Sequence, residues 1–249
     1  MLPIVVLACR VLEPAIRRTL PPEVAESVRY LDYGLHRVPA QLTGAVQETL
    51  EEIEAPSLVV VGYGLCGTAL RGIRAGMHTL LVPRTDDCIA LVLGSYQAYA
   101  REFAAAPGTY YLTSGWLESG SHPLKEYEEY LPTYGEKQAL WLLDQQYRNY
   151  ERVALVASTD DELAALRARA LEVARFCERW DMRYEEIAGS DDYVRRLVDT
   201  AFALRDGALR PEDAGPDFLV IPPGHEIRDR KSTRLNSSHL GISRMPSSA

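Results

Sequence analysis

The sequence predicts an α/β fold: a Rossmann-like, largely parallel sheet with helices on both faces, followed by a second and smaller α/β unit. Short apolar runs alternate along the chain with longer amphipathic segments, which is the pattern of βαβ units. The composition is 47% hydrophobic and 25% charged over 249 residues, so the chain can build a sizeable core without disulfides.

Four strands are predicted in the first part of the chain. Each is a short apolar run bounded by charged residues, glycine or proline, and they lie at residues 4–8, 28–33, 58–61 and 79–82. Amphipathic helices are expected between and after these strands, at residues 13–20, 39–53, 68–75 and 87–104. Strands separated by helices favour parallel pairing in one sheet.

The middle of the chain has a different composition. Residues 107–134 are rich in aromatic residues, glycine and proline and sustain no period, so we expect an ordered loop or lid there. Beyond it the pattern predicts helices at 135–150, 158–180 and 191–204 and strands at 153–157, 183–187 and 218–221. Ser158 or Thr159 is expected to cap the second of these helices.

These elements predict an N-terminal domain of residues 1–134 and a smaller C-terminal unit of residues 135–228. Residues 229–249 are rich in serine, have no periodicity and resemble a translated sequencing adapter. We therefore expect a disordered or artefactual tail and leave it out of the fold.

Charge and hydropathy exclude several classes of partner. A net charge of −8 argues against nucleic-acid binding, which needs clustered lysine and arginine. The apolar runs are far shorter than the roughly 20 residues that cross a bilayer, and no basic signal-peptide start is present. We expect a cytoplasmic protein whose four cysteines, with no CxxC pair, are thiols or metal ligands rather than disulfides.

Three cysteines and one histidine follow the four predicted strands. In chain order they are Cys9, His36, Cys66 and Cys88. Because parallel strands end at the same edge of a sheet, we expect these side chains to converge. Sulfur and imidazole suit Zn²⁺ and similar ions, so the sequence predicts a metal site formed by these four residues, with zinc as the first choice.

The same edge supplies candidate catalytic residues, namely Cys66, Cys88 and Asp87. A thiolate is a nucleophile, and Asp86 or Asp87 is expected to hydrogen-bond His36, as metal-binding histidines usually require. Each cysteine taken singly fits a packing role equally well, because free cysteine is among the most buried residue types. Cys177 lies within a predicted helix and is expected in the core.

A second interpretation of this region uses its glycines. The pattern Gly62-x-Gly64-x-x-Gly67 follows a strand, opens a predicted helix and has an acidic residue beyond the next strand, as in dinucleotide-binding sites. The alternative is a glycine-rich turn with a structural role. Arg84 beside Thr85 fits either a solvated charge or a contact with an anionic substrate.

Six segments of the chain resemble the family of proteins of unknown function called DUF1638. They are LACRVLEP (7–14), LHRVPAQL (35–42), VGYGLCGTAL (61–70), VPRTDDCIALVLGS (82–95), PGTYYLTSGWLE (107–118) and FLVIPPG (218–224). The resemblance covers nearly the whole chain up to about residue 227. It implies that the four predicted metal ligands, together with Tyr111 and Trp116, belong to the motifs of the family.

The resemblance also suggests a biological setting. Members are α/β proteins of anaerobic bacteria and archaea, and some occur near genes for corrinoid-dependent methyltransferases. This implies a corrinoid protein or methyltransferase as a partner, a corrinoid as a cofactor reached through that partner, and Tyr111 and Trp116 as candidate cofactor-binding residues. It names no substrate.

Three functions therefore remain open. The first is a zinc or other transition-metal site, beneath the aromatic loop, that serves one-carbon or methyl transfer on a small molecule with a metal-bound thiolate as nucleophile. The second is a non-enzymatic accessory or carrier protein for a corrinoid methyltransferase system. The third is a nucleotide-dependent enzyme that uses the glycine-rich turn.

Overall fold

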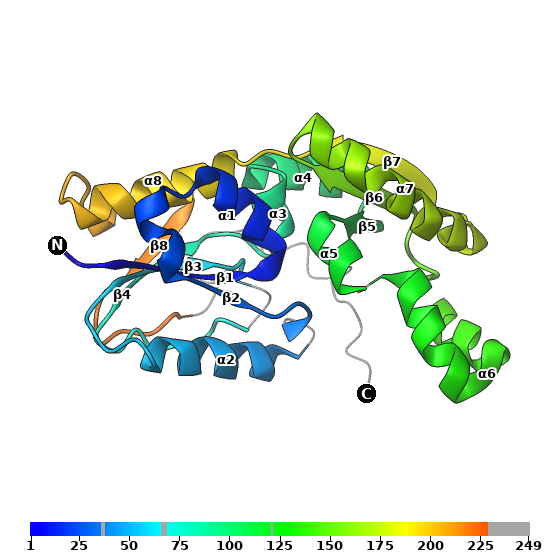
Figure 1. Ribbon diagram of the computed structural model, residues 1–249, viewed down its shortest axis with the longest axis horizontal. Coiled ribbons are helices and arrows are strands. Elements are labelled where there is room, and N and C mark those ends of the chain that lie inside the picture. Colours follow the sequence, from blue (N-terminus) through cyan, green and yellow to red (C-terminus); the bar gives the residue numbers. More distant parts are fainter. Residues whose placement is uncertain (36–37, 66–68, 121, 229–249) are drawn as a thin grey trace. The chain divides into compact units, whose positions relative to one another are not determined.

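The computed structural model describes residues 1–35, 38–65, 69–120 and 122–228 (Figure 1). The described chain forms two compact units, one of residues 1–96 and 191–228 and the other of residues 97–190. Each unit has its own mostly parallel sheet, which confirms the predicted α/β class. The division differs from the predicted 1–134 and 135–228, because the last helix and strand return to the first sheet.

The first unit contains a five-stranded sheet of order β2-β1-β3-β4-β8. Its strands are β1 (Ile4–Cys9), β2 (Val28–Leu31), β3 (Leu58–Gly62), β4 (Thr79–Pro83) and β8 (Phe218–Ile221). The first four strands run parallel, whereas β8 pairs antiparallel with β4. The four strands that precede the predicted site residues are therefore neighbours in one sheet and end at one edge.

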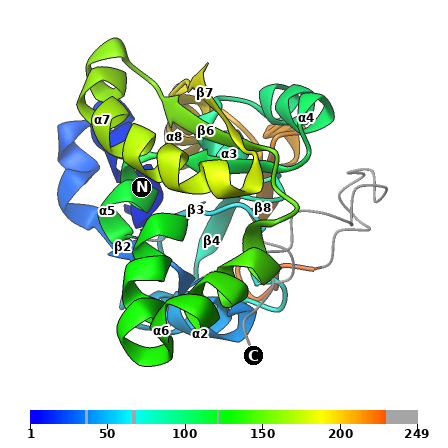
Figure 2. The same cartoon turned by 90° about the vertical axis from the view of Figure 1, so that its right-hand side faces the viewer.

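Helices cover both faces of this sheet. The helices of the unit are α1 (Glu13–Thr19), α2 (Pro39–Glu51), α3 (Ile89–Val92) and α8 (Asp192–Arg205), with short 3₁₀ turns at Arg10–Leu12, Pro22–Ser27 and Pro211–Asp213. Helix α8 packs on β3 and β4 and contacts α1 and α3, while α2 covers the opposite face (Figures 1 and 2). Leu42, Val46 and Leu50, spaced by four residues, form the buried stripe of α2.

The second unit contains a three-stranded parallel sheet of order β5-β6-β7. Its elements are α4 (Tyr96–Ala105), β5 (Thr109–Leu112), α5 (Ser114–Ser119), α6 (Pro123–Tyr147), β6 (Arg152–Ala157), α7 (Asp160–Cys177), a 3₁₀ turn (Glu178–Trp180) and β7 (Arg183–Ala188). Helix α7 packs on β6. The predicted cap of α7 is confirmed at Thr159, whose hydroxyl accepts from the Glu162 N–H at 3.1 Å.

The prediction of a loop or lid at residues 107–134 is wrong. This segment contains β5, α5 and the first half of α6, and Tyr110 and Leu117 belong to the core of the second unit. Pro132 lies within α6, whereas Gly135 leaves helical geometry with φ 71° and ψ 163°, so α6 consists of two helical parts on either side of a kink at Gly135. The single helix predicted at 87–104 is also divided. It forms two helices, α3 and α4, separated near Gly94, whose φ of 83° is not helical.

Helix α6 is also relevant to the prediction that the chain has no membrane span. It runs over 25 residues, but charged side chains are distributed along it. In the part of the chain that the structure describes, no helix combines the length and the apolar character that crossing a bilayer requires.

Candidate functional site

Cys9 is the last residue of β1 and lies at the carboxyl edge of the five-stranded sheet. Cys9 is 4% exposed, and its sulfur lies beside the Val11 backbone and the Tyr63 side chain. Burial raises the pKa of the Cys9 thiol, and these two polar neighbours only partly oppose that effect. On its own Cys9 is a poor nucleophile, so its position fits a ligand or a packing residue better than a reactive thiol.

The turn after β3 lies tightly against both neighbouring strand ends. A Cβ at Gly62 would come within 2.7 Å of the Ala8 Cβ, next to Cys9, and a Cβ at Gly64 would come within 2.4 Å of the Asp87 carbonyl carbon. The Leu65 N–H donates to the Thr85 carbonyl at 2.7 Å. These contacts bring the ends of β1, β3 and β4 together through their backbones.

Cys88 follows β4 and directly precedes the short helix α3. It is 7% exposed, and the neighbouring Asp87 carboxylate accepts from the Ile89 N–H at 2.8 Å. Asp87 therefore holds the turn in which Cys88 lies. Its predicted role, orienting His36, concerns a residue outside the described chain and stays a prediction.

Two of the four predicted metal ligands, His36 and Cys66, lie outside the described residues, as does Gly67. Within the residues that are described, no group of three or more histidine, cysteine, aspartate or glutamate side chains is arranged to hold a metal ion. What the structure brings together is the strand ends: Cys9 ends β1, and the residues just before Cys66 contact the residues just before Cys88.

The strand order gives this edge a further property. The chain passes from β1 to β2 on one side and then to β3 on the other side of β1, so the connections diverge between β1 and β3. In open α/β sheets, ligands bind outside the carboxyl ends of the strands at such a switch point. Cys9 and the Gly62–Gly64 turn lie at this position.

The structure does not contain, in its described residues, the helix that the dinucleotide interpretation requires after the glycine-rich turn. Residues 69–72 form a turn and Arg74 makes an isolated bridge with Glu226, so the helix predicted at 68–75 is wrong for its described residues, 69–75. A dinucleotide site of this type places the pyrophosphate at a helix N-terminus. The close contacts of Gly62 and Gly64 explain both glycines by packing instead.

Tyr111 and Trp116, the predicted cofactor-binding aromatics, belong to the second unit. Tyr111 lies on β5, and Trp116 is a buried residue of α5. They are parts of a strand and a helix rather than of a lid. Cys177 is fully buried in the same unit, and burial raises the pKa of its thiol to about 12, as expected for a core cysteine.

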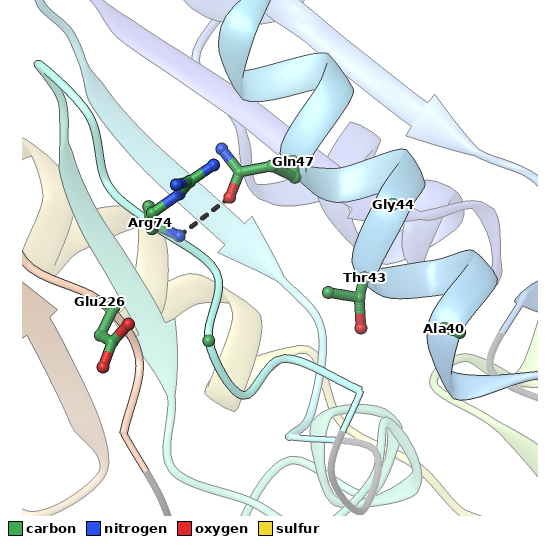
Figure 3. A pocket seen from close by; sticks show the side chains of 7 residues that line it. Ala40, Thr43, Gly44, Gln47, Arg74 and Glu226 are labelled. Carbon is green, nitrogen blue, oxygen red and sulfur yellow. Dashed lines mark hydrogen bonds between the residues drawn. The ribbon is translucent and has the colours of Figure 1, made fainter.

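A shallow pocket of about 660 Å³ lies elsewhere in the first unit, beside α2 (Figure 3). Its lining residues are Ala40, Thr43, Gly44, Gln47, Gly72, Arg74 and Glu226. The Gln47 side chain accepts from the Arg74 backbone N–H at 2.9 Å and thereby ties the turn to the helix (Figure 3). None of the predicted site residues lines this pocket.

Sequence reasoning missed Tyr63, whose side chain lies beside Cys9. The available signal was an aromatic residue between two glycines directly after a buried strand. Sequence reasoning also left the role of Arg84 and Thr85 open. Both follow β4, and both have a buried polar side-chain atom with no hydrogen-bond partner, Nε of Arg84 and Oγ1 of Thr85.

Comparisons with known proteins give one positive finding. The model of the family described as "Protein of unknown function (DUF1638)" matches residues 30–198, more than half of the chain, and this stretch includes His36, Cys66 and Cys88 but not Cys9. Searches of the curated proteins and of the solved structures found no match. The extent of the family match shows that the chain belongs to the DUF1638 family.

Proposed function

We propose that this protein binds a transition-metal ion, zinc being the best chemical match, at the carboxyl edge of its five-stranded sheet. The ligands are the predicted set of Cys9, Cys66, Cys88 and His36. The observation that carries the proposal is the contact between the segments that bear the cysteines: Tyr63 reaches Cys9, and the Gly64–Leu65 backbone contacts Thr85 and Asp87. Three thiolates and one imidazole are a common tetrahedral set for zinc.

Strand spacing defines how the ligands can meet. Neighbouring strands lie roughly 4.8 Å apart, and the ligand atoms of a tetrahedral zinc site lie about 4 Å apart. Because β3 lies between β1 and β4, three cysteines that follow these strands are spaced so that they can bind one metal ion. His36 follows β2, which is two strands from β3, and the five residues from Leu31 to His36 can span roughly 16 Å when extended.

Such a site supports nucleophilic group transfer. Metal binding keeps a thiolate deprotonated at neutral pH, which a buried thiol such as Cys9 does not achieve alone. We extend the proposal to the transfer of a one-carbon or methyl group to or from a small molecule. The position at the switch point of the sheet, where α/β proteins bind small ligands, supports this extension.

Metal analysis of the purified protein tests the proposal. The protein is prepared anaerobically without a metal-affinity tag, and metal per chain is measured by inductively coupled plasma mass spectrometry. We expect one metal ion per chain in the wild type and in Cys177→Ser, the matched control in the other unit. We expect its loss in Cys9→Ser, Cys66→Ser and Cys88→Ser.

Two outcomes would contradict the metal site. One is a wild type without stoichiometric metal, and the other is a Cys66→Ser variant that keeps it. Circular dichroism of each variant separates loss of a ligand from loss of the fold, since removing a functional ligand should leave the sheet intact whereas removing a structural one should not.

A further inference from the structure

Arg84 is a charged residue without a partner at the carboxyl end of β4. It follows Pro83, the last residue of the strand, and its backbone N–H donates to the Asp217 carbonyl at 2.7 Å. Its side chain is partly buried, and Nε has no hydrogen-bond partner. A guanidinium stays charged in proteins, so its burial without a partner costs free energy that nothing in the described chain offsets.

Other arginines show how unusual this is. Every other arginine in the described ranges that is not exposed pairs with a carboxylate. These pairs are Arg10 with Glu13, Arg29 with Glu52, Arg152 with Glu102 and Glu185, and Arg205 with Asp206. Arg84 therefore differs from the residues that share its burial and its chemistry.

Thr85, the next residue in the chain, also has a buried polar atom without a hydrogen-bond partner. It is 0% exposed, its Oγ1 has no hydrogen-bond partner, and its carbonyl accepts from Leu65 across the edge. A buried hydroxyl without a partner is rare and destabilising, and it calls for an explanation. Two neighbouring residues thus leave donors unused at one strand end.

Two carboxylates close to Arg84, one across the sheet and one along the chain, serve other groups. Asp217 precedes β8, and its backbone carbonyl accepts from Arg84, but its carboxylate forms an ion pair with Arg196 of α8. Asp87 accepts from the Ile89 N–H. Neither carboxylate forms an ion pair with Arg84, so its positive charge is available to an anion from outside the described chain.

We propose that Arg84 and Thr85 form a binding site for the anionic group of a small molecule, a carboxylate or a phosphate. The planar guanidinium binds either oxyanion through paired N–H donors, and the Thr85 hydroxyl adds a third donor. The site lies at the carboxyl edge of β4, four residues before Cys88 in the chain. It needs no metal and stands on the described residues alone.

Thermal unfolding of the full chain with simple anions tests this site. Sodium phosphate and sodium acetate are added at millimolar concentrations, with sodium chloride at equal ionic strength as the reference. We expect phosphate, acetate or both to raise the Tm of the wild type, because an anion that binds only the folded state stabilises it. The salt that acts identifies the oxyanion class.

Variants locate the effect. Arg84→Met should abolish the anion-dependent rise in Tm, and Thr85→Val should reduce it. Arg74→Met, which removes an exposed arginine of the same unit, should leave it unchanged. If neither salt raises the wild-type Tm above the chloride reference, or if Arg84→Met shows the same rise as the wild type, the site does not exist. Thr85→Val keeps the test decisive should Arg84→Met not fold.

Discussion

Arg84, which follows a strand, and Arg152, which begins one, are both at least partly buried, yet their side-chain contacts differ. Arg152, at the start of β6 in the second unit, is 4% exposed and donates to Thr109, Glu102 and Glu185 at 2.6 to 2.9 Å. Arg84, after β4 in the first unit, has no hydrogen-bond partner for its buried Nε. A buried charge whose hydrogen bonds are made within the protein has a structural role. A buried charge without such partners indicates a site for a ligand.

The largest effect we predict is in the second unit. Arg152→Met removes the cation, leaves Glu102 and the Thr109 hydroxyl without this donor and leaves Glu185 with Arg183 alone, so we expect a loss of about 3 kcal/mol in the free energy of unfolding. Urea unfolding followed by circular dichroism measures it. A change below about 0.5 kcal/mol would show that the Arg152 network does not stabilise the unit.

A second prediction concerns the packing of the carboxyl edge in the first unit. Gly64→Ala places a methyl group against the Asp87 backbone, so we expect about 2 kcal/mol of destabilisation and, in addition, loss of metal. Gly44→Ala is the control, since a Cβ there meets nothing within 4 Å and lies within α2, where alanine is favoured by about 0.5 to 1 kcal/mol. Equal stability of the two variants would contradict the close approach of the turns.

Acid should affect the Arg152 network in a defined direction. Two hydrogen bonds hold the pKa of Glu185 below its ordinary value of 4.5. The one from Arg183 has the larger effect, and the one from Arg152 has the next largest. A lowered folded-state pKa gives stability that is present above pH 4.5 and is lost as pH falls through the lowered pKa. Because the carboxylate is 38% exposed, we expect well under about 1 kcal/mol.

The check is urea unfolding at a series of pH values from neutral to below 4.5. The wild type should lose stability more steeply with acid than Arg152→Met, in which one donor to Glu185 is gone. Parallel curves for the two proteins would mean that the ion pair with Glu185 contributes nothing.

The last effect has the opposite sign. Arg84→Met and Thr85→Val each remove a buried polar group without a partner, so in anion-free buffer we expect both to unfold at the same or a higher urea concentration than the wild type, with a gain of up to about 1 kcal/mol. A loss of 2 kcal/mol or more in Arg84→Met, close to that of Arg152→Met, would erase the distinction between the two arginines.

Much of the fold could be predicted from the sequence because local patterns determine it. The buried strands β1, β3 and β4 and the apolar stripe of α2 are visible as short runs and as spacing by four residues. Helix α6 was missed in its first half because Pro132 and Gly135 usually end helices, whereas here Pro132 lies within the helical segment and only Gly135 departs from helical geometry. The return of β8 to the first sheet depends on contacts remote in sequence.

The candidate site was predictable to a similar degree. That Cys9 and Cys88 follow parallel strands at one edge follows from strand order along the chain. Tyr63 was not predicted, because its position beside Cys9 depends on the path of the turn after β3. Likewise, the absence of partners for Arg84 and Thr85 is a property of the folded chain that no sequence pattern records.

The central claim is that the carboxyl edge of the first sheet is a ligand-binding edge with a metal at its centre. X-ray absorption spectroscopy at the absorption edge of the bound metal tests it most directly, because it gives the type, number and distance of the coordinating atoms. The account predicts three sulfur atoms at about 2.3 Å and one nitrogen at about 2.0 Å. A first coordination shell made of oxygen or nitrogen atoms alone, without sulfur, would contradict it.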